Sequence, residues 1–148
     1  MPQISFHTGV ADKIGYACRL LRKASRQAVR VRVIGDAAEL DLLDKALWTF
    51  DAHDFVPHLR WQPGAAVAPA LRRTSIWLTP DALAWPDGVE PPAVLVNLGD
   101  DTPVELVAFE RVIEIVSADP HERRAGRARW RRYEAAGHPI KHFPVAEE

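Results

Sequence analysis

Residues 29–35, Val-Arg-Val-Arg-Val-Ile-Gly, are the stretch of the sequence that decides the fold. Their β-branched side chains favour an extended strand, and the final glycine is typical of the point where a strand ends. Asp36 then predicts a helix N-cap, and apolar residues recur at helical spacing from there to about Phe50. Before the strand, residues 12–28 show the same helical period, and residues 3–7 alternate as a strand does. This order of strand, helix, strand and helix predicts an α/β fold with parallel neighbouring strands.

The rest of the chain continues the alternation of strands and helices. Two proline-rich connections, residues 51–70 and 80–92, separate the later elements. The predicted organisation is a single domain over residues 1–148, in which residues 137–148 form a tail that is partly ordered at most. We predict strands at residues 75–78, 93–99 and 111–116, and a last helix from Asp119 or Pro120 to about Ala136.

Composition limits the class of protein. The chain has 148 residues, a formal net charge of -1 and 47% hydrophobic residues, which suits one folded domain and excludes wholesale disorder. No apolar run approaches the length of about 18 residues that a membrane helix needs, and the first residues lack the pattern of a secretory signal. The single cysteine, Cys18, cannot form an internal disulfide. We therefore expect a cytoplasmic protein that has no contact with a membrane.

Motifs for nucleotide, metal or acyl chemistry are absent from the sequence. The residues after the first two predicted strands, 7–12 and 35–38, match neither GxGxxG nor GxxxxGK(S/T), the loops that surround phosphate. The six histidines show no zinc-hydrolase spacing, and no serine lies in a Gly-x-Ser-x-Gly turn. We predict no catalytic residue, no metal site and no cofactor. A small nucleotide-binding α/β enzyme is the enzymatic alternative.

The last predicted helix has a basic face. At about 100° per residue, one stripe of it holds Arg123, Arg127, Trp130 and Arg131, and a different stripe, with Arg129 and Tyr133, can face the sheet. Guanidinium groups around an indole suit a C-terminal carboxylate that follows a large side chain. They also suit single-stranded nucleic acid, although the net charge of -1 counts against it. A solvated basic helix with a half-buried tryptophan is the third possibility.

Large apolar side chains also gather at the end of the second predicted helix and in the loop after it. They are Trp48, Phe55 and Val56, followed by Pro57 and His58. Such side chains can plug the edge of the sheet. Alternatively, they form an exposed patch with aromatic anchors, which is typical of a protein–protein contact.

Two of these stretches resemble the chi subunit family of bacterial DNA polymerase III. The run Leu43-Asp44-Lys45-Ala46-Leu47-Trp48, followed after six residues by Phe55-Val56-Pro57-His58, resembles the family's helix end and FVPH loop at the same spacing. Position 130 holds tryptophan where the family has tyrosine, which keeps an aromatic side chain there. The family's C-terminal pattern is resembled by Val116, Arg123, Arg127, Trp130, Arg132, Tyr133 and Gly137.

The resemblance implies a three-layer α/β/α sandwich around a mixed five-stranded sheet, which is similar to a Rossmann fold but has no phosphate-binding loop. It also implies a non-catalytic accessory subunit of the DNA polymerase III holoenzyme that acts in DNA replication. Such a subunit links the clamp loader, through the small psi subunit, to the C-terminal tail of single-stranded DNA-binding protein. Its association with single-stranded DNA is therefore indirect.

The resemblance also assigns roles to residues by their position. The surface that meets psi corresponds to Trp48 and Phe55, with Pro57 and His58 beside them. The family's tail-binding pocket, in which a basic side chain meets the terminal carboxylate, corresponds to Val116, Arg123, Arg127 and Trp130, with Arg131 as a neighbour.

Overall fold

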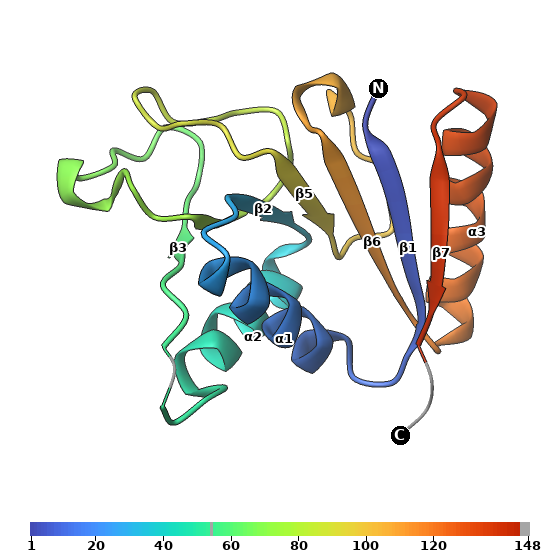
Figure 1. Cartoon of the computed structure of the whole chain (residues 1–148), viewed down its shortest axis with the longest axis horizontal. Helices are drawn as coiled ribbons and strands as arrows, with labels where there is room; N and C mark the ends of the chain where they lie inside the picture. The colour runs from blue at the N-terminus through green and yellow to red at the C-terminus, as the bar shows by residue number, and fades with distance from the viewer. Residues whose placement is uncertain (54, 146–148) are drawn as a thin grey trace.

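A parallel sheet with helices on both faces forms the molecule, and the computed structural model describes residues 1–53 and 55–145 (Figure 1). The strands lie in the order β3-β4-β2-β5-β6-β1-β7. The elements are β1 (Gln3–Val10), α1 (Lys13–Arg26), β2 (Val31–Ile34), α2 (Ala37–Thr49), β3 (Leu59–Arg60), η1 (Pro69–Leu71), β4 (Ile76–Thr79), β5 (Val94–Asn97), η2 (Leu106–Ala108), β6 (Arg111–Ser117), α3 (Pro120–Ala135) and β7 (Ile140–Pro144).

The prediction of a mixed five-stranded sheet is wrong on both counts. The described residues form seven strands, and every pair of neighbouring strands is parallel. The strands are parallel because each connection carries the chain back to the other end of the sheet before the next strand begins. The α/β class, by contrast, is confirmed.

The two additional strands are the edge strands β3 and β7. β3 has only two residues, and four of the five residues of β7 are exposed. Because an exposed edge strand buries neither of its faces, no apolar alternation marks it in the sequence. β7 lies in the predicted tail, 137–148, where it pairs with β1 from Ile4 to Thr8. Residues 146–148 of that tail lie outside the described residues.

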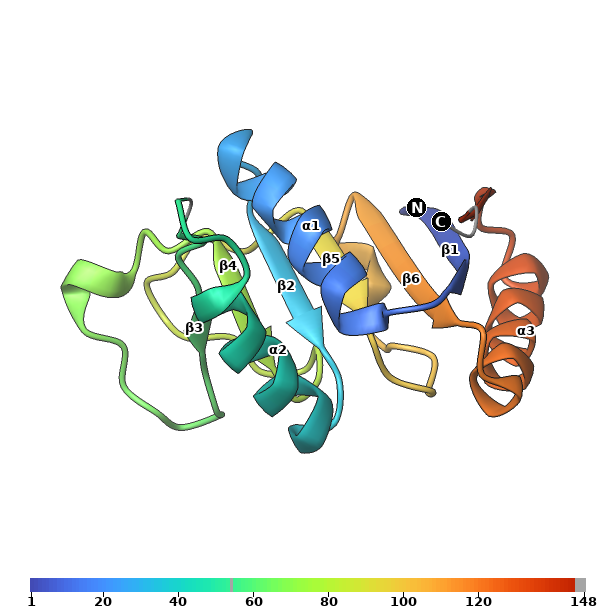
Figure 2. The ribbon, with the colours of Figure 1, turned by 90° about the horizontal axis from the view of Figure 1, so that it is seen from below.

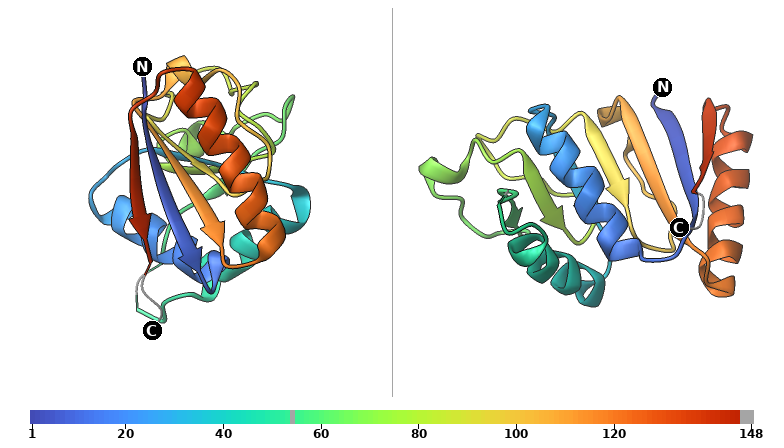
Figure 3. Two further views of the ribbon diagram at one scale, coloured as in Figure 1. Left: turned by 90° about the vertical axis from the view of Figure 1, so that its right-hand side faces the viewer. Right: turned by 60° about the horizontal axis from the view of Figure 1, so that its bottom comes forward.

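Side chains that alternate along the strands build a separate apolar cluster on each face of the sheet. On β6, Ile113 and Ile115 belong to the cluster beneath α1 and α2, whereas Val112 and Val116 belong to the cluster beneath α3. Figure 2 shows α1 and α2 lying over the sheet, and the left panel of Figure 3 shows α3 along β6 and β1. None of the helices in the described part of the chain is both long and apolar enough to cross a membrane.

Each long helix begins at an aspartate whose carboxylate accepts a hydrogen bond from a backbone N–H of the first turn. Asp12 accepts from Gly15 at 3.0 Å, Asp36 from Glu39 at 2.7 Å, and Asp119 from Glu122 at 3.1 Å. Such caps satisfy donors that a helix start otherwise leaves free, and they fix where each helix begins. The three helix starts lie at the carboxyl ends of the parallel strands, so the aspartates also set the charge at this edge of the sheet.

The two proline-rich connections, 51–70 and 80–92, bury aromatic side chains although they carry little regular structure. Trp61, Trp77 and Val89 form a third apolar cluster. Arg32, which is buried at 4% exposure, donates from Nε to Thr79 Oγ1 at 2.8 Å and lies over the Trp85 ring. This cluster covers the part of the sheet that α3 does not reach.

Candidate functional site

A pocket of about 660 Å³ opens between α3, β1 and β7. We call it the arginine pocket. Other residues that line it include Phe6, Thr8, Gly126, His142 and Val145. All five residues that the resemblance assigned to one site line it together: Val116, Arg123, Arg127, Trp130 and Arg131.

The floor of the arginine pocket exists because α3 lies unusually close to β6. Val116 is buried on β6, and Gly126 faces it from α3. A Cβ atom at position 126 would lie 3.0 Å from Val116 Cγ2, which is tighter than ordinary van der Waals contact. The absent side chain of Gly126 therefore sets the spacing between helix and strand.

The Trp130 indole forms the apolar wall of the pocket. Its ring lies 4.9 Å from the Phe6 ring, and the His142 ring meets it edge-on at 5.6 Å. Trp130 is half-buried, so part of the indole stays accessible from the pocket. An apolar side chain that enters the pocket would therefore contact an indole that Phe6 already holds in place.

The three arginines of the pocket have no partners among the residues that the structure describes. Arg123, Arg127 and Arg131 are exposed, and residues 1–53 and 55–145 offer no hydrogen bond or ion pair to any of their guanidinium groups. No aspartate or glutamate of the described chain lines the pocket. The pocket thus combines an apolar wall with positive charge that is available to an anion.

Arg129, on the opposite side of α3, is fully engaged. It is 2% exposed, donates from Nε to Glu114 Oε1 at 3.0 Å, and donates from Nη1 to the Asp100 carbonyl at 2.9 Å. Tyr133 donates its hydroxyl to Glu114 Oε2 at 2.6 Å, and Asn97 Nδ2 donates to the same carboxylate. The helix is therefore fixed in rotation about its axis, which leaves the arginine-rich stripe outside, as its periodicity predicts.

Burial dominates the electrostatics of this internal cluster. Glu114 is completely buried, and the loss of solvent raises the pKa of its carboxyl group although Arg129 opposes the shift. Burial, followed by the neighbouring Glu114, also raises the pKa of Tyr133 far above its usual range. The tyrosine therefore keeps its proton and remains a donor to the carboxylate.

The second predicted surface, which we call the aromatic surface, comprises Trp48, Phe55, Pro57 and His58. The Trp48 and Phe55 rings stack at 4.9 Å and are 60% and 51% exposed. Pro57 is exposed, whereas the His58 side chain is buried and its Nε2 lies 2.7 Å from Asp44 Oδ1. Val56, at 1% exposure, is buried in the core, whereas the two aromatic rings are not. Trp48 and Phe55 therefore do not plug the sheet.

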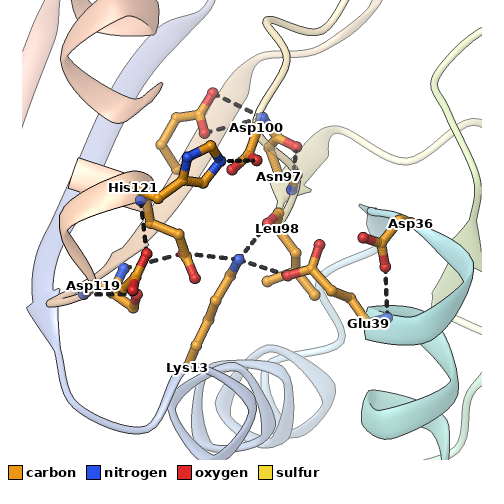
Figure 4. A network of polar contacts seen from close by, with 12 residues as sticks. Lys13, Asp36, Glu39, Asn97, Leu98, Asp100, Asp119 and His121 are labelled. Atoms are coloured by element: carbon orange, nitrogen blue, oxygen red, sulfur yellow. Dashed lines mark hydrogen bonds and ion pairs between the residues drawn. The ribbon is translucent and has the colours of Figure 1, made fainter. Parts of the chain in front are cut away.

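Charged side chains of the protein itself gather at the carboxyl ends of β2 and β5, where a Rossmann-like fold binds phosphate (Figure 4). The Lys13 ammonium lies 2.6 Å from Glu39 Oε2 and 3.0 Å from Glu122 Oε1, and it also donates to the Leu98 carbonyl. Burial raises the pKa of Glu39. A second pocket at this edge is lined by Asp36, Glu39, Asp81, Asp100 and Asp101.

These carboxylates disfavour a phosphate at that edge of the sheet. Among residues 1–53 and 55–145, no three histidine, cysteine, aspartate or glutamate side chains are grouped so as to hold a metal ion. The arginine pocket and the aromatic surface are the two candidate binding surfaces.

Some residues that line the arginine pocket were not predicted from the sequence. Thr8 and His142 come from β1 and β7, and β7 carries no strand signal. Gly126 had a weak signal, because a glycine inside a helix costs about 1 kcal/mol and needs a packing reason to be there. The sequence pattern of α3 therefore reveals only those lining residues that lie on α3, and not those on the neighbouring strands.

Comparison with known proteins agrees with the resemblance noted in the sequence. The profile of the family described as DNA polymerase III chi subunit, HolC, matches residues 1–141. A curated relative from Pseudomonas aeruginosa, DNA polymerase III subunit chi, is 32% identical over 130 residues, which cover 87% of this chain and 84% of the relative. The chain therefore belongs to the chi subunit family of DNA polymerase III, and its role is that of a non-catalytic accessory subunit in DNA replication.

Proposed function

We propose that this chain links the clamp loader, through the small psi subunit, to the C-terminal tail of single-stranded DNA-binding protein. The observation that carries the proposal is the arginine pocket, which is lined by a half-buried indole and by three arginines that have no partner among the described residues. A tail that is acidic and ends in phenylalanine has the matching chemistry. It brings carboxylates for the guanidinium groups and an aromatic ring for the apolar wall.

In the proposed complex, Arg127 and Arg123 donate charge-assisted hydrogen bonds to the terminal carboxylate and to the acids before it. The terminal phenylalanine ring packs against Trp130, Val116 and Gly126, which line the pocket together. Arg131 is the neighbouring cation for an upstream acid. No bond is made or broken in this role, which is consistent with a non-catalytic subunit.

A contact of this size gives a weak complex. Burial of a few residues in one pocket corresponds to an affinity in the micromolar range, about -8 kcal/mol. Many tails on a protein-coated strand raise the effective affinity without any new contact. The chain would thereby stay close to single-stranded DNA, in the bacterial cytoplasm, without binding the DNA itself.

Titration of a fluorescent peptide tests this role. The probe has several aspartates, a C-terminal phenylalanine and a free carboxylate. Arg127→Ala is expected to weaken binding by roughly tenfold or more, because a hydrogen bond to a charged group contributes about 1.5–3 kcal/mol. Moderate salt is expected to weaken binding to the unchanged protein.

Arg124→Ala is the matched control, since Arg124 is exposed on the same helix but does not line the pocket. It should bind the peptide as the unchanged protein does. Equal affinity of the Arg127→Ala variant would contradict the proposal. A naked oligonucleotide that binds with a steep salt dependence, when the peptide does not bind, would support the nucleic-acid alternative instead.

The aromatic surface supports the second half of the proposal. Two stacked and exposed aromatic rings are the kind of anchors that protein–protein contacts use. His58, held by Asp44 and by the Val56 carbonyl, meets the Trp48 ring edge-on at 5.4 Å and supports it from behind. We assign this surface to the psi subunit.

A further inference from the structure

The strand β7 adds one ionisable side chain to the arginine pocket. His142 lines the pocket from the side opposite α3. Its Nε2 lies 2.6 Å from Thr8 Oγ1 on β1, and its ring meets Trp130 edge-on. These two contacts hold the imidazole in the pocket that the arginines of α3 also line.

In the described part of the chain, the charged side chains that line the pocket together with His142 are all positive. From α3 they are Arg123, Arg127 and Arg131, which line the pocket with it. β1 contributes the uncharged Thr8 and Phe6. Lys141, the residue before His142 on β7, points to the other face of the strand.

We propose that His142 is a fourth cationic group of the pocket, which takes up a proton when an acidic ligand binds. This inference rests on the proposed function, because it concerns the binding of the same carboxylate-bearing peptide. Carboxylates that bind beside His142 favour the protonated imidazole. Since the complex then holds more protons than the free protein, a fall in pH from 8 to 6 strengthens binding.

No other ionisable group of the pocket changes its charge in this range. The arginines stay protonated, and the aspartates of the peptide stay ionised, throughout it. His7 lies between Phe6 and Thr8 in the sequence, but it does not line the pocket. Its side chain faces α1, where its Nδ1 is hydrogen-bonded to the Tyr16 hydroxyl. Burial, together with Arg111, lowers the pKa of His7, so it remains neutral where His142 gains its proton.

The experiment is a titration of the same fluorescent peptide at pH 8, 7 and 6 at constant ionic strength. The unchanged protein is expected to bind about two- to fivefold more tightly at pH 6 than at pH 8, the effect of one added rim charge. His142→Gln is expected to remove this dependence. His142→Lys, with a permanent charge, is expected to bind at pH 8 as the unchanged protein does at pH 6.

The matched control is His121→Gln. His121 is exposed on the first turn of α3 and pairs with Asp100 outside the pocket, and its variant should keep the full pH dependence. A pH dependence that persists in His142→Gln overturns the inference and leaves the proposed function in place. Absence of peptide binding by the unchanged protein at every pH overturns both. Thermal unfolding of each variant shows that the fold is retained.

Discussion

Arg127 and Arg129 lie two positions apart on α3 and meet different surroundings. Arg129 is buried against Glu114, where each charge needs the other, because an ion without its partner is poorly solvated inside the protein. Arg127 is exposed and has no partner among the described residues. The buried arginine stabilises the fold, and the exposed one is available to a ligand.

Replacement of each arginine by methionine separates these two roles. Arg129→Met leaves Glu114 buried without its cation and is expected to lower the free energy of unfolding by about 3–5 kcal/mol. Arg127→Met is the control and should change it by less than about 0.5 kcal/mol. Urea denaturation of both variants provides the measurement. Similar stabilities for the two variants would show that the Glu114 pair does not hold the helix.

The helical periodicity of α3 alone assigns Arg127 and Arg129 to different faces of the helix. Residues that share a stripe at helical spacing share a surface, so the pocket side and the sheet side of α3 follow from the sequence. The periodicity of one helix carries no information about residues on other elements. Thr8 and His142 were therefore missed, since each reaches the pocket through strand pairing.

At the scale of elements, the contact between α3 and β6 depends on Gly126. Val116 is β-branched, buried and stiff, so it cannot easily move away from a side chain at position 126. Alanine would favour the helix by about 1 kcal/mol in isolation, but here its Cβ would meet Val116. The packing of two elements and the floor of the pocket thus depend on the same pair of residues.

Gly126→Ala is accordingly expected to destabilise the protein by about 1–2 kcal/mol, as overpacking does. In a Val116→Ala background, the same substitution should become neutral or stabilising by up to about 1 kcal/mol, because the clash is gone and the helix propensity remains. Chemical denaturation of the two single variants and the double variant measures this reversal. Equal effects of Gly126→Ala in both backgrounds would contradict the close contact.

The elements themselves were predictable to different degrees. α1, α2 and α3 have aspartate caps and clear periodicity, and the central strands are runs of β-branched residues. The sequence therefore predicts the positions of these elements well. The edge strands β3 and β7 bury too little to leave a pattern. The order of strands and helices predicts parallel neighbouring strands, which the structure confirms, whereas the mixed five-stranded sheet that the family resemblance implies is corrected.

On the scale of the whole molecule, the arginine pocket and the aromatic surface lie at opposite ends of the sheet. The pocket is lined in part by β7, whereas Trp48 lies in the last turn of α2 and Phe55 precedes β3. β7 and β3 are the two opposite edge strands of the sheet (Figure 1). The seven-stranded sheet separates them. Two partners that bind these surfaces would therefore not compete with each other.

This separation predicts independent losses of function. Phe55→Ala is expected to abolish co-purification with a co-expressed psi subunit and to leave the affinity for the acidic peptide unchanged. Arg127→Ala is expected to do the reverse. Pull-down and peptide titration on both variants test the prediction. If Phe55→Ala still co-purifies with psi normally, the aromatic surface has only a structural role.

The arginines of the pocket also have a kinetic consequence. Where a binding cation is tied up inside a free protein, an arriving anion must wait until that internal pair breaks. Arg123, Arg127 and Arg131 have no such pair to give up in the described chain. Encounter with an oppositely charged segment can therefore proceed at a rate limited by diffusion and accelerated by long-range attraction. Since a weak complex formed that fast must also dissociate fast, the subunit could exchange rapidly among neighbouring tails.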